Sequence, residues 1–273
     1  MRSLLFAFQF LTIIPVRIDG TFRNDALAAS TVWYVLVGAV QGFALLATDY
    51  TMGNLFHPDI VPALILAVLI ASTGAFHLDG LADTADALSM KSSGSADKDR
   101  ERRLAIMKDP AAGPAGVTVI FLVLLLKYLC IRSCANLLPF TYSSALVLMP
   151  AFAKWSMVAA MAHGRPARPD GLGRIFLERV TMRHFILATL SGCVLITVLV
   201  FKWGRFGDID PILFYPSVGA GVYALTLIWV RFCSSRFGGM TGDTLGALNE
   251  IIELIFLMAV LAWSRLSISF ATA

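Results

Sequence analysis

Seven apolar stretches, each about as long as a bilayer is thick, constrain this sequence more than any other feature. They cover residues 28–48, 60–78, 115–135, 143–162, 184–202, 212–231 and 249–268. A helix needs about 20 predominantly apolar residues to cross the hydrocarbon core. Only 15% of the residues are charged, against about 25% in soluble domains, and the mean hydropathy is +0.76. We therefore expect an all-α, polytopic membrane protein with about seven transmembrane helices, in which residues 1–273 form one integral-membrane domain.

The first residues form a shorter apolar segment. Residues Met1–Val16 contain a single basic side chain, and Pro15 interrupts the run before it reaches the length of a span. No small-residue cleavage site of the kind that ends a signal peptide follows. We therefore expect an N-terminal amphipathic helix that lies at the membrane interface or is partly buried.

Lysines and arginines are unevenly divided between the loops. Most of them lie in the N-terminal segment and in the loops at 79–113, 163–183 and 232–248, which the predicted spans place on one side. Basic side chains accumulate on the cytoplasmic side of membrane proteins. We therefore expect these loops in the cytoplasm. The net charge of +4 is explained by this bias, so the expected partner is the lipid bilayer and no nucleic acid.

The most informative polar pattern follows the second apolar stretch directly. In His77-Leu78-Asp79-Gly80-Leu81-Ala82-Asp83-Thr84-Ala85-Asp86, three carboxylates stand at i, i+4 and i+7. Each residue of a helix turns by about 100°, so these carboxylates would lie within about 60° of one another. Like charges repel, and carboxylates near hydrocarbon are costly. A cation is therefore expected, and Mg²⁺ is the simplest candidate because it takes oxygen ligands and shares them with substrate phosphates.

A second acidic pattern begins beside the last apolar stretch. A helix that starts near Thr241 would place Asp243, Gly246, Glu250 and Glu253 on one stripe about 80° wide. Carboxylates inside an apolar run should be paired or bound to metal. Asp243 has an alternative role as a helix N-cap, which would leave a cluster of backbone N–H groups suited to phosphate.

Basic side chains in the loops are candidates for phosphate contacts. The charged segment 97–110 predicts a short amphipathic helix stopped by Pro110, and its alternative role is to lie on anionic lipid. Prolines and glycines predict an irregular backbone in the loop at 163–183. The candidates are Arg100, Arg102, Arg103, Lys108, Arg165, Arg168 and Arg174. Ordinary cytoplasmic arginines would produce the same pattern.

Lys154 stands near the middle of a predicted span. An ionisable side chain at that depth faces the bundle interior and has either a buried partner or a functional role. Lys127 is less informative, because it lies nearer to the polar end of its span. The four cysteines show no metal-ligand spacing, so none is expected to bind a metal ion.

Together these motifs resemble one family, the cobalamin synthases, or adenosylcobinamide-GDP ribazoletransferases. The segments that carry the resemblance follow the family's order over nearly the whole chain. They are residues 8–16, 77–86 and 99–109, Gly171-Leu172-Gly173, and residues 241–247 with Glu250 and Glu253. The aspartate run and the Thr-Gly-Asp run are characteristic of the family, and the other segments are weaker signals.

The resemblance implies the last assembly step of the nucleotide loop of cobalamin. In that reaction, adenosylcobinamide-GDP gives up GMP, and α-ribazole or its 5′-phosphate takes the cobinamide phosphate. The resemblance also implies Mg²⁺ as the cofactor and the bacterial cytoplasmic (inner) membrane as the location, with the active site on the cytoplasmic side. Both substrates are small molecules, and homo-oligomerisation is left open.

The resemblance implies two roles for the candidate residues, metal ligand and substrate contact. The expected metal ligands are Asp79, Asp83, Asp86, Asp243, Glu250 and Glu253, of which the four aspartates are also the expected catalytic residues. The expected substrate contacts are His77, Arg100, Arg103, Lys108, Lys154, Arg168, Arg174 and Thr241. No covalent nucleophile is required, because phosphoryl transfer depends largely on positioning and charge neutralisation.

Other functional classes remain as alternatives. A CDP-alcohol phosphotransferase also uses aspartate-rich helices and Mg²⁺, but its Asp-Gly-x-x-Ala-Arg start differs from Asp79-Gly80-Leu81-Ala82-Asp83. An aromatic prenyltransferase would carry Asn-Asp-x-x-x-Asp, and no asparagine precedes Asp79. A cation-coupled transporter would have acids in its spans, but residues 1–136 and 137–273 show no internal repeat, and the acids cluster at span ends.

Overall fold

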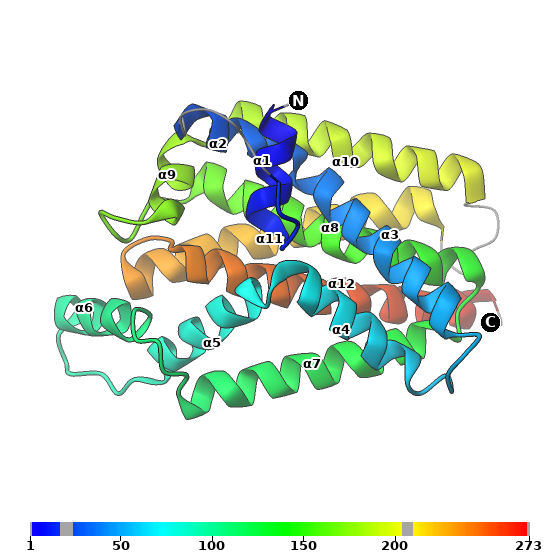
Figure 1. Ribbon diagram of the computed structural model, residues 1–273, viewed down its shortest axis with the longest axis horizontal. Coiled ribbons are helices and arrows are strands. Elements are labelled where there is room, and N and C mark those ends of the chain that lie inside the picture. Colours follow the sequence, from blue (N-terminus) through cyan, green and yellow to red (C-terminus); the bar gives the residue numbers. More distant parts are fainter. Residues whose placement is uncertain (1, 17–23, 204–209, 272–273) are drawn as a thin grey trace.

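The structure, a computed structural model, describes residues 2–16, 24–203 and 210–271 and is a bundle of helices (Figure 1). Its elements are α1 (Arg2–Leu11), α2 (Asn24–Ser30), the 3₁₀ turn η1 (Thr31–Trp33), α3 (Tyr34–Met52), α4 (Val61–Thr73), α5 (Phe76–Ser89), α6 (Ala96–Ile106), α7 (Pro114–Cys134), α8 (Pro139–His163), α9 (Leu172–Arg179), α10 (Met182–Trp203), α11 (Pro211–Phe237) and α12 (Gly242–Ala271). The expected all-α class is confirmed.

Six helices of the described chain are long and apolar enough to cross a membrane. They are Asp25–Met52, which joins α2, η1 and α3, and Pro114–Cys134, Pro139–His163, Met182–Phe201, Pro211–Phe237 and Gly242–Leu266. These confirm six of the predicted spans, and the bent pair α4 and α5 brings the count to seven if it forms one span.

The apolar stretch predicted at 60–78 is bent in the structure and divided between two helices. Helices α4 and α5 meet at 89°, because Gly74 and Ala75 both adopt left-handed backbone angles, with φ of 61° and 62°. This conformation is strained for alanine, whose Cβ crowds the following carbonyl. The bend redirects the aspartate-rich helix α5 away from the line of α4.

Helix α8 forms the centre of the bundle, and 89% of its most apolar stretch of 18 residues is buried. Helix α3 packs directly on it through Gly38 and Gly42, which are spaced as in the small-residue motif of membrane helices. A Cβ atom at Gly38 would lie 2.6 Å from the carbonyl oxygen of Pro150, and one at Gly42 would meet the backbone of Val147. The two glycines therefore allow the backbones of α3 and α8 to touch.

The expected N-terminal helix is confirmed over Arg2–Leu11, while Met1 lies outside the described residues. Helix α1 buries Phe6, Ala7 and Leu11 against the bundle. After it, the backbone N–H of Ile13 donates a hydrogen bond of 2.9 Å to the carbonyl of Ser72. The N-terminal segment is thereby held beside the bend between α4 and α5.

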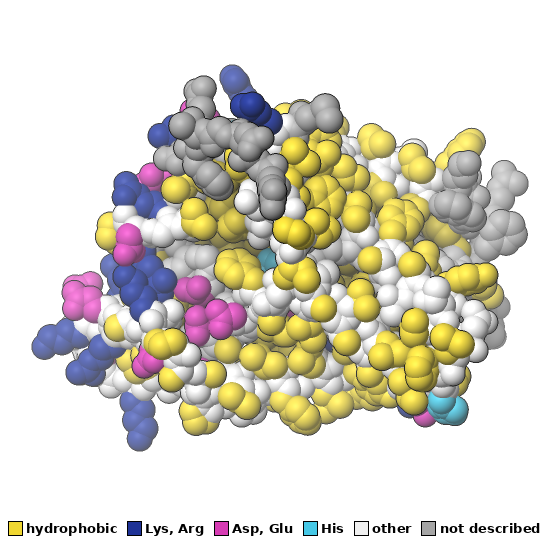
Figure 2. Space-filling model, viewed as in Figure 1, with side chains coloured by type: hydrophobic (Ala, Val, Ile, Leu, Met, Phe, Trp, Pro, Cys, Tyr) yellow, Lys and Arg dark blue, Asp and Glu magenta, His cyan; other side chains and the backbone are white. Residues whose placement is uncertain are grey.

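Charged side chains gather at one end of the bundle. Figure 2 shows lysines, arginines and acids concentrated at the end where Figure 1 places α6 and α9, while apolar side chains cover much of the remaining visible face. The loops at 79–113 and 163–183 lie at this end, as their common charge predicted. The candidate site residues must therefore be sought there.

Candidate active site

The loop after α8 is held against the chain that precedes α12. The N–H of Met240 donates to the carbonyl of Arg165 at 2.7 Å, and the N–H of Ala167 donates to the carbonyl of Met240 at 2.9 Å. Gly239 has no space for a Cβ, because the atom would strike the Arg165 carbonyl. This short pairing delivers the next side chain, Arg168, to the start of α12.

Thr241 caps the first turn of α12. Its hydroxyl accepts a hydrogen bond from the N–H of Thr244 at 3.2 Å, and the Thr244 hydroxyl accepts one from the N–H of Thr241 at 2.8 Å. This reciprocal arrangement is a capping box. The alternative role of Asp243 as the N-cap is therefore wrong, and the expected substrate contact Thr241 is engaged in the cap, although it also lines the pocket described below.

The carboxylate of Asp243 is consequently free to face the loop. Its Oδ2 atom lies 3.3 Å from Nη1 of Arg168 and accepts a hydrogen bond of 3.2 Å from the Thr241 hydroxyl. Arg168 is held in turn by the carbonyl of Leu104, to which its Nη2 donates at 3.2 Å. The pair is only partly exposed, so solvent weakens it less than an ordinary surface ion pair.

Helix α5 packs against the same end of α12 through glycines. A Cβ at Gly80 would lie 2.6 Å from the carbonyl oxygen of Asp243, and one at Gly246 would lie 3.2 Å from the Cα of His77. Asp83 stands one turn beyond Gly80. Its carboxylate is repelled electrostatically by Asp79, Asp86 and Asp243 and attracted by Arg168. The structure thus brings the first acidic pattern close to Asp243 of the second.

Replacing Gly80 by alanine should separate the two acidic helices. The new methyl group would collide with backbone atoms of Asp243, which are unable to rotate away as a flexible side chain would. We expect at least a tenfold loss of activity in protein that still inserts into membranes. Gly221→Ala is the matched control, because a Cβ there meets nothing within 4 Å. Equal activities of the two variants would contradict this close packing.

Asp86 has a different environment from the other acids. Its carboxylate accepts hydrogen bonds from the N–H groups of Gly113 at 2.7 Å and Gly116 at 2.9 Å, at the N-terminus of α7. A carboxylate is favourable there because the first N–H groups of a helix lack partners and carry partial positive charge. Asp86 therefore anchors α7 to α5 and does not fit the expected role of metal ligand. The sequence signal was Gly113-Pro114-Ala115-Gly116, which leaves these amides accessible.

Three of the expected phosphate contacts are bound to other parts of the protein. Arg103 donates from Nη1 to the carbonyl of Arg236 at the end of α11, at 3.2 Å, and Arg100 packs on the backbone of Gly238. Lys108 pairs with Asp170 at 3.2 Å, which lowers the pKa of that carboxyl group. Arg100 and Arg103 thus hold α6 against α11 and lie outside the pocket lining.

A pocket of about 240 Å³ opens between α8, α9 and the start of α12. Its charged lining residues are Arg168, Asp170, Arg174 and Asp243, and the N-terminal residues of α9 and α12 contribute backbone to its wall. Arg174 is exposed, and it is oriented by Glu178 at 2.7 Å and by the carbonyl of Pro169. Of the expected substrate contacts, Arg168, Arg174 and Thr241 line this pocket, and Lys108 lies beside it on Asp170.

Glu250 and Glu253 do not join the site at the end of the bundle. Each accepts a hydrogen bond of 2.6 Å from Nζ of Lys127, deep between α7 and α12. Lys154 donates to Asn249 at 2.7 Å and lies 4.0 Å from Glu253. The expectation that these glutamates ligate metal does not fit this neutralised cluster. Lys127, for which the sequence pattern predicted no role, is its central residue.

His77 and Lys154 lie outside the lining of the pocket, although the His77 ring is in edge contact with that of Phe76, which lines it. His77 is 1% exposed, and neither ring nitrogen has a hydrogen-bond partner among the described residues. Lys154 is wholly buried in α8. Neither side chain lines the pocket, so the structure gives no support to the expected substrate contacts at these two positions.

The described residues contain no group of three or more His, Cys, Asp and Glu side chains placed to hold a metal ion. Mg²⁺ commonly takes only one or two carboxylates and completes its shell with water and substrate phosphate. Asp83 and Asp243 are suited to this limited role, because their mutual repulsion, reinforced by Asp79, favours a cation between them.

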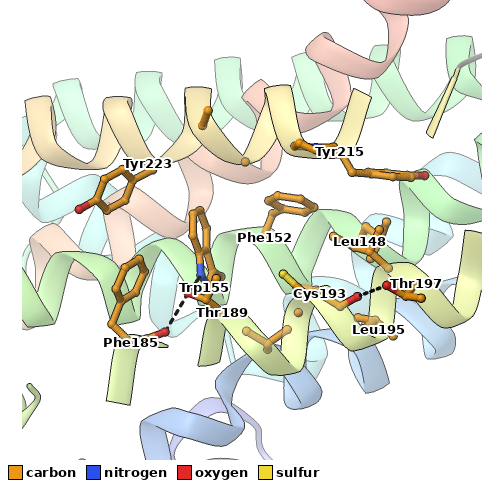
Figure 3. A pocket seen from close by; sticks show the side chains of 17 residues that line it. Leu148, Phe152, Trp155, Phe185, Thr189, Cys193, Leu195, Thr197, Tyr215 and Tyr223 are labelled. Atoms are coloured by element: carbon orange, nitrogen blue, oxygen red, sulfur yellow. Dashed lines mark hydrogen bonds between the residues drawn. The ribbon is translucent and has the colours of Figure 1, made fainter. Parts of the chain in front are cut away.

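A larger cavity lies elsewhere in the bundle. It measures about 630 Å³ and is lined by apolar side chains of α8, α10 and α11 (Figure 3). Two of its polar side chains are satisfied locally: Trp155 donates to the Thr189 hydroxyl at 2.9 Å, and Thr197 donates to the carbonyl of Cys193 at 2.8 Å. The lining contains no Lys, Arg, Asp or Glu side chain to neutralise a phosphate or hold a metal ion, so this cavity is not the candidate active site.

Comparison with known proteins assigns the family. Residues 3–261 match the family described as cobalamin-5-phosphate synthase. The chain belongs to this family. No solved structure matches the chain. The membership confirms the resemblance drawn from the acidic motifs, and both motifs lie within the matched residues.

Relatives of the cobalamin-5-phosphate synthase family align over almost the whole chain. Proteins named adenosylcobinamide-GDP ribazoletransferase from Thermodesulfovibrio yellowstonii and Pseudomonas aeruginosa (strain UCBPP-PA14) are 28% and 36% identical. The alignments cover 99% and 95% of this chain and 100% and 98% of those proteins. A protein of the same name from Caldanaerobacter subterraneus is 33% identical over 93% of this chain and 96% of its own length. The family is therefore one of transferases.

Proposed function

We propose that this chain is an adenosylcobinamide-GDP ribazoletransferase. It joins adenosylcobinamide-GDP to α-ribazole or its 5′-phosphate and yields adenosylcobalamin or its 5′-phosphate together with GMP. A ribose hydroxyl oxygen forms a bond to the phosphorus next to cobinamide, the bond from that phosphorus to GMP breaks, and the hydroxyl proton passes to a base. The observation that carries the proposal is the Arg168–Asp243 pair, set beside the acidic helix α5 in a chain of this family.

The pocket supplies positive charge for a diphosphate. Arg168 and Arg174 present guanidinium groups, whose planar donors match phosphate oxygens. The first N–H groups of α12 add the partial positive charge of a helix N-terminus. Binding a phosphate oxygen would let Arg168 turn from Asp243, so the pair in the substrate-free protein keeps the guanidinium close to its working position.

Mg²⁺ is the proposed cofactor, and Asp83 and Asp243 are its proposed ligands. When bound, the ion would neutralise the diphosphate and the departing GMP. Asp79 is exposed on the same end of α5 and is the proposed acceptor of the hydroxyl proton. Asp86 holds α7 in place and positions α5 without touching the substrate.

The proposed location is the bacterial inner membrane, with the pocket facing the cytoplasm. Support comes from the basic loops, which share the charged end of the bundle with the pocket (Figure 2). A cytoplasmic pocket would receive the nucleotide-activated substrate from solution while the apolar spans anchor the enzyme.

The activity is tested with detergent-solubilised protein, adenosylcobinamide-GDP and α-ribazole. We expect GMP and adenosylcobalamin in equal amounts, loss of both on chelation with EDTA, and recovery with added Mg²⁺. A transporter would release no GMP when no sealed compartment is present. The absence of GMP from this assay would therefore overturn the proposal. Activity that persists in EDTA would remove the metal from it.

Arg168→Gln should lower kcat/KM about 10²-fold, because one charged donor to the phosphates is lost. Arg102→Gln is the matched control, since Arg102 is exposed on α6 and does not line the pocket. Steady-state kinetics on purified protein would measure both variants. Similar values for the two would mean that Arg168 does not contact the transferred phosphates.

A further inference from the structure

Part of the lining of the pocket is aromatic and has no role in binding a phosphate. Besides the charged residues, its lining includes Phe10, Phe76 and Phe176 from three separate helices. We propose that this aromatic wall binds the flat aromatic base of a substrate whose ribose phosphate reaches Arg168. The inference rests on the proposed function and deepens it, because it assigns a base subsite to the same pocket.

The three rings form a continuous chain of contacts. The ring centroid of Phe10 lies 4.7 Å from that of Phe176, in a tilted arrangement, and 6.0 Å from that of Phe76, edge to face. Phe176 is 1% exposed and packs against Phe10, whereas Phe76 is 46% exposed. A half-exposed phenylalanine beside a charged pocket leaves apolar area without a protein partner. Nucleobases stack on such rings whatever their hydrogen-bonding pattern.

The position of Phe76 depends on the strained bend. It is the first residue of α5 and follows Gly74 and Ala75, the two residues in left-handed conformation. A straight continuation of α4 would carry Phe76 in another direction. Strain of this kind persists where the surrounding structure holds it and is concentrated at ligand sites. The hydrogen bond from Ile13 to Ser72 fastens the chain after Phe10 to the same bend.

The size of the pocket selects a group of this kind. At about 240 Å³ it is smaller than the 300–1,000 Å³ typical of sites that enclose a drug-sized molecule. A corrinoid ring is too large for it, whereas one fused-ring base with part of its ribose is of suitable size. The guanidinium groups of Arg168 and Arg174 in the same lining complement a phosphate attached to that ribose. The occupant is therefore an aromatic base on a ribose phosphate.

Two substrates carry such a base. One is adenosylcobinamide-GDP, through guanine, and the other is α-ribazole or its 5′-phosphate, through benzimidazole. Initial rates with each substrate varied against saturating amounts of the other distinguish them. Phe76→Leu keeps apolar volume but removes the ring, and Phe76→Tyr keeps the ring. Phe121→Leu is the matched control, because Phe121 is 63% exposed on α7, away from the pocket.

We expect Phe76→Leu and Phe10→Leu to raise KM for one substrate about fivefold to tenfold and to leave kcat within about twofold. The KM of the other substrate should not change in either leucine variant. Phe76→Tyr should raise the KM of the affected substrate less than Phe76→Leu does, and Phe121→Leu should show wild-type values. The substrate affected identifies the base. Unchanged KM values for both substrates in both leucine variants, or a fall in kcat alone, would overturn the base subsite and leave the proposed function intact.

A binding measurement keeps the two proposals separable. Equilibrium dialysis of wild-type and Phe76→Leu protein would use GMP, α-ribazole 5′-phosphate and ribose 5-phosphate as probes. A preference for one aromatic nucleotide over ribose 5-phosphate that disappears in Phe76→Leu supports the subsite even if the wild-type protein proves inactive as a transferase. Equal binding of all three probes by the wild-type protein, or no binding, would overturn the subsite.

Discussion

Replacing Asp83 by asparagine is expected to lower turnover on the order of 10³-fold in membranes that still contain the folded protein. Asparagine keeps the size of the side chain and removes its charge. Asp83 is half-buried. Its negative charge is repelled by those of Asp79, Asp86 and Asp243 and attracted by the positive charge of Arg168. Removing its charge relaxes that repulsion, so the folded protein should be no less stable while the attraction for a divalent cation falls.

The control is Asp97→Asn, which removes an exposed charge from the first turn of α6. GMP release per amount of membrane protein and Mg²⁺ titration of the residual rate would be measured for both variants. A higher Mg²⁺ requirement in Asp83→Asn agrees with a role in holding the ion. Near-normal turnover of this variant would refute the proposed role of Asp83.

Lys127→Met should cost about 3–5 kcal/mol of stability, because it leaves Glu250 and Glu253 buried without their principal cation. Lys127 is 1% exposed and the glutamates are 8% and 1% exposed, so water has little access to compensate. Lys154, at 4.0 Å from Glu253, provides only partial neutralisation. The expected result is a large fall in unfolding temperature and in the yield of folded protein.

Removing one of the stranded charges should restore much of this loss. In Lys127→Met combined with Glu250→Gln, one cation and one acid are removed together, Glu253 keeps Lys154 at 4.0 Å, and Asn249 can still hydrogen-bond to both side chains. Thermal unfolding in detergent would compare the single and double variants with Lys98→Met, an exposed control on α6. A single variant as stable as this control would contradict the cluster's structural role.

Local patterns in the sequence predicted the helices and the acidic faces for a physical reason. The length of an apolar run and the 100° turn per helical residue are properties of neighbouring residues. Helix α5 accordingly begins at Phe76 and presents Asp79 and Asp83 as expected, and α12 begins at Gly242 beside Asp243. The capping box of Thr241 and Thr244 was also within reach, since its members lie three residues apart.

Such local patterns could not predict contacts between residues that are far apart in the sequence. Asp86 meets Gly113 across 27 residues, and Lys127 meets Glu250 across 123. Nothing in the periodicity of one helix specifies which other helix will pack against it. The same limit explains why the pattern predicted equal roles for three aspartates on one helical face, although one of them anchors a neighbouring helix.

By itself the sequence determined the membrane class, the helical spans, the charged end of the bundle and the family, because each depends on composition or on residues close together in the chain. Only the tertiary structure decided that Glu250 and Glu253 are neutralised by Lys127, that Asp86 caps α7, and that Phe10 and Phe76 line the pocket of Arg168 and Asp243. Those assignments depend on how bent and packed helices bring remote side chains together. The left-handed backbone at Gly74 and Ala75 bends α5 away from α4, and the absence of a side chain at Gly80 lets α5 touch α12.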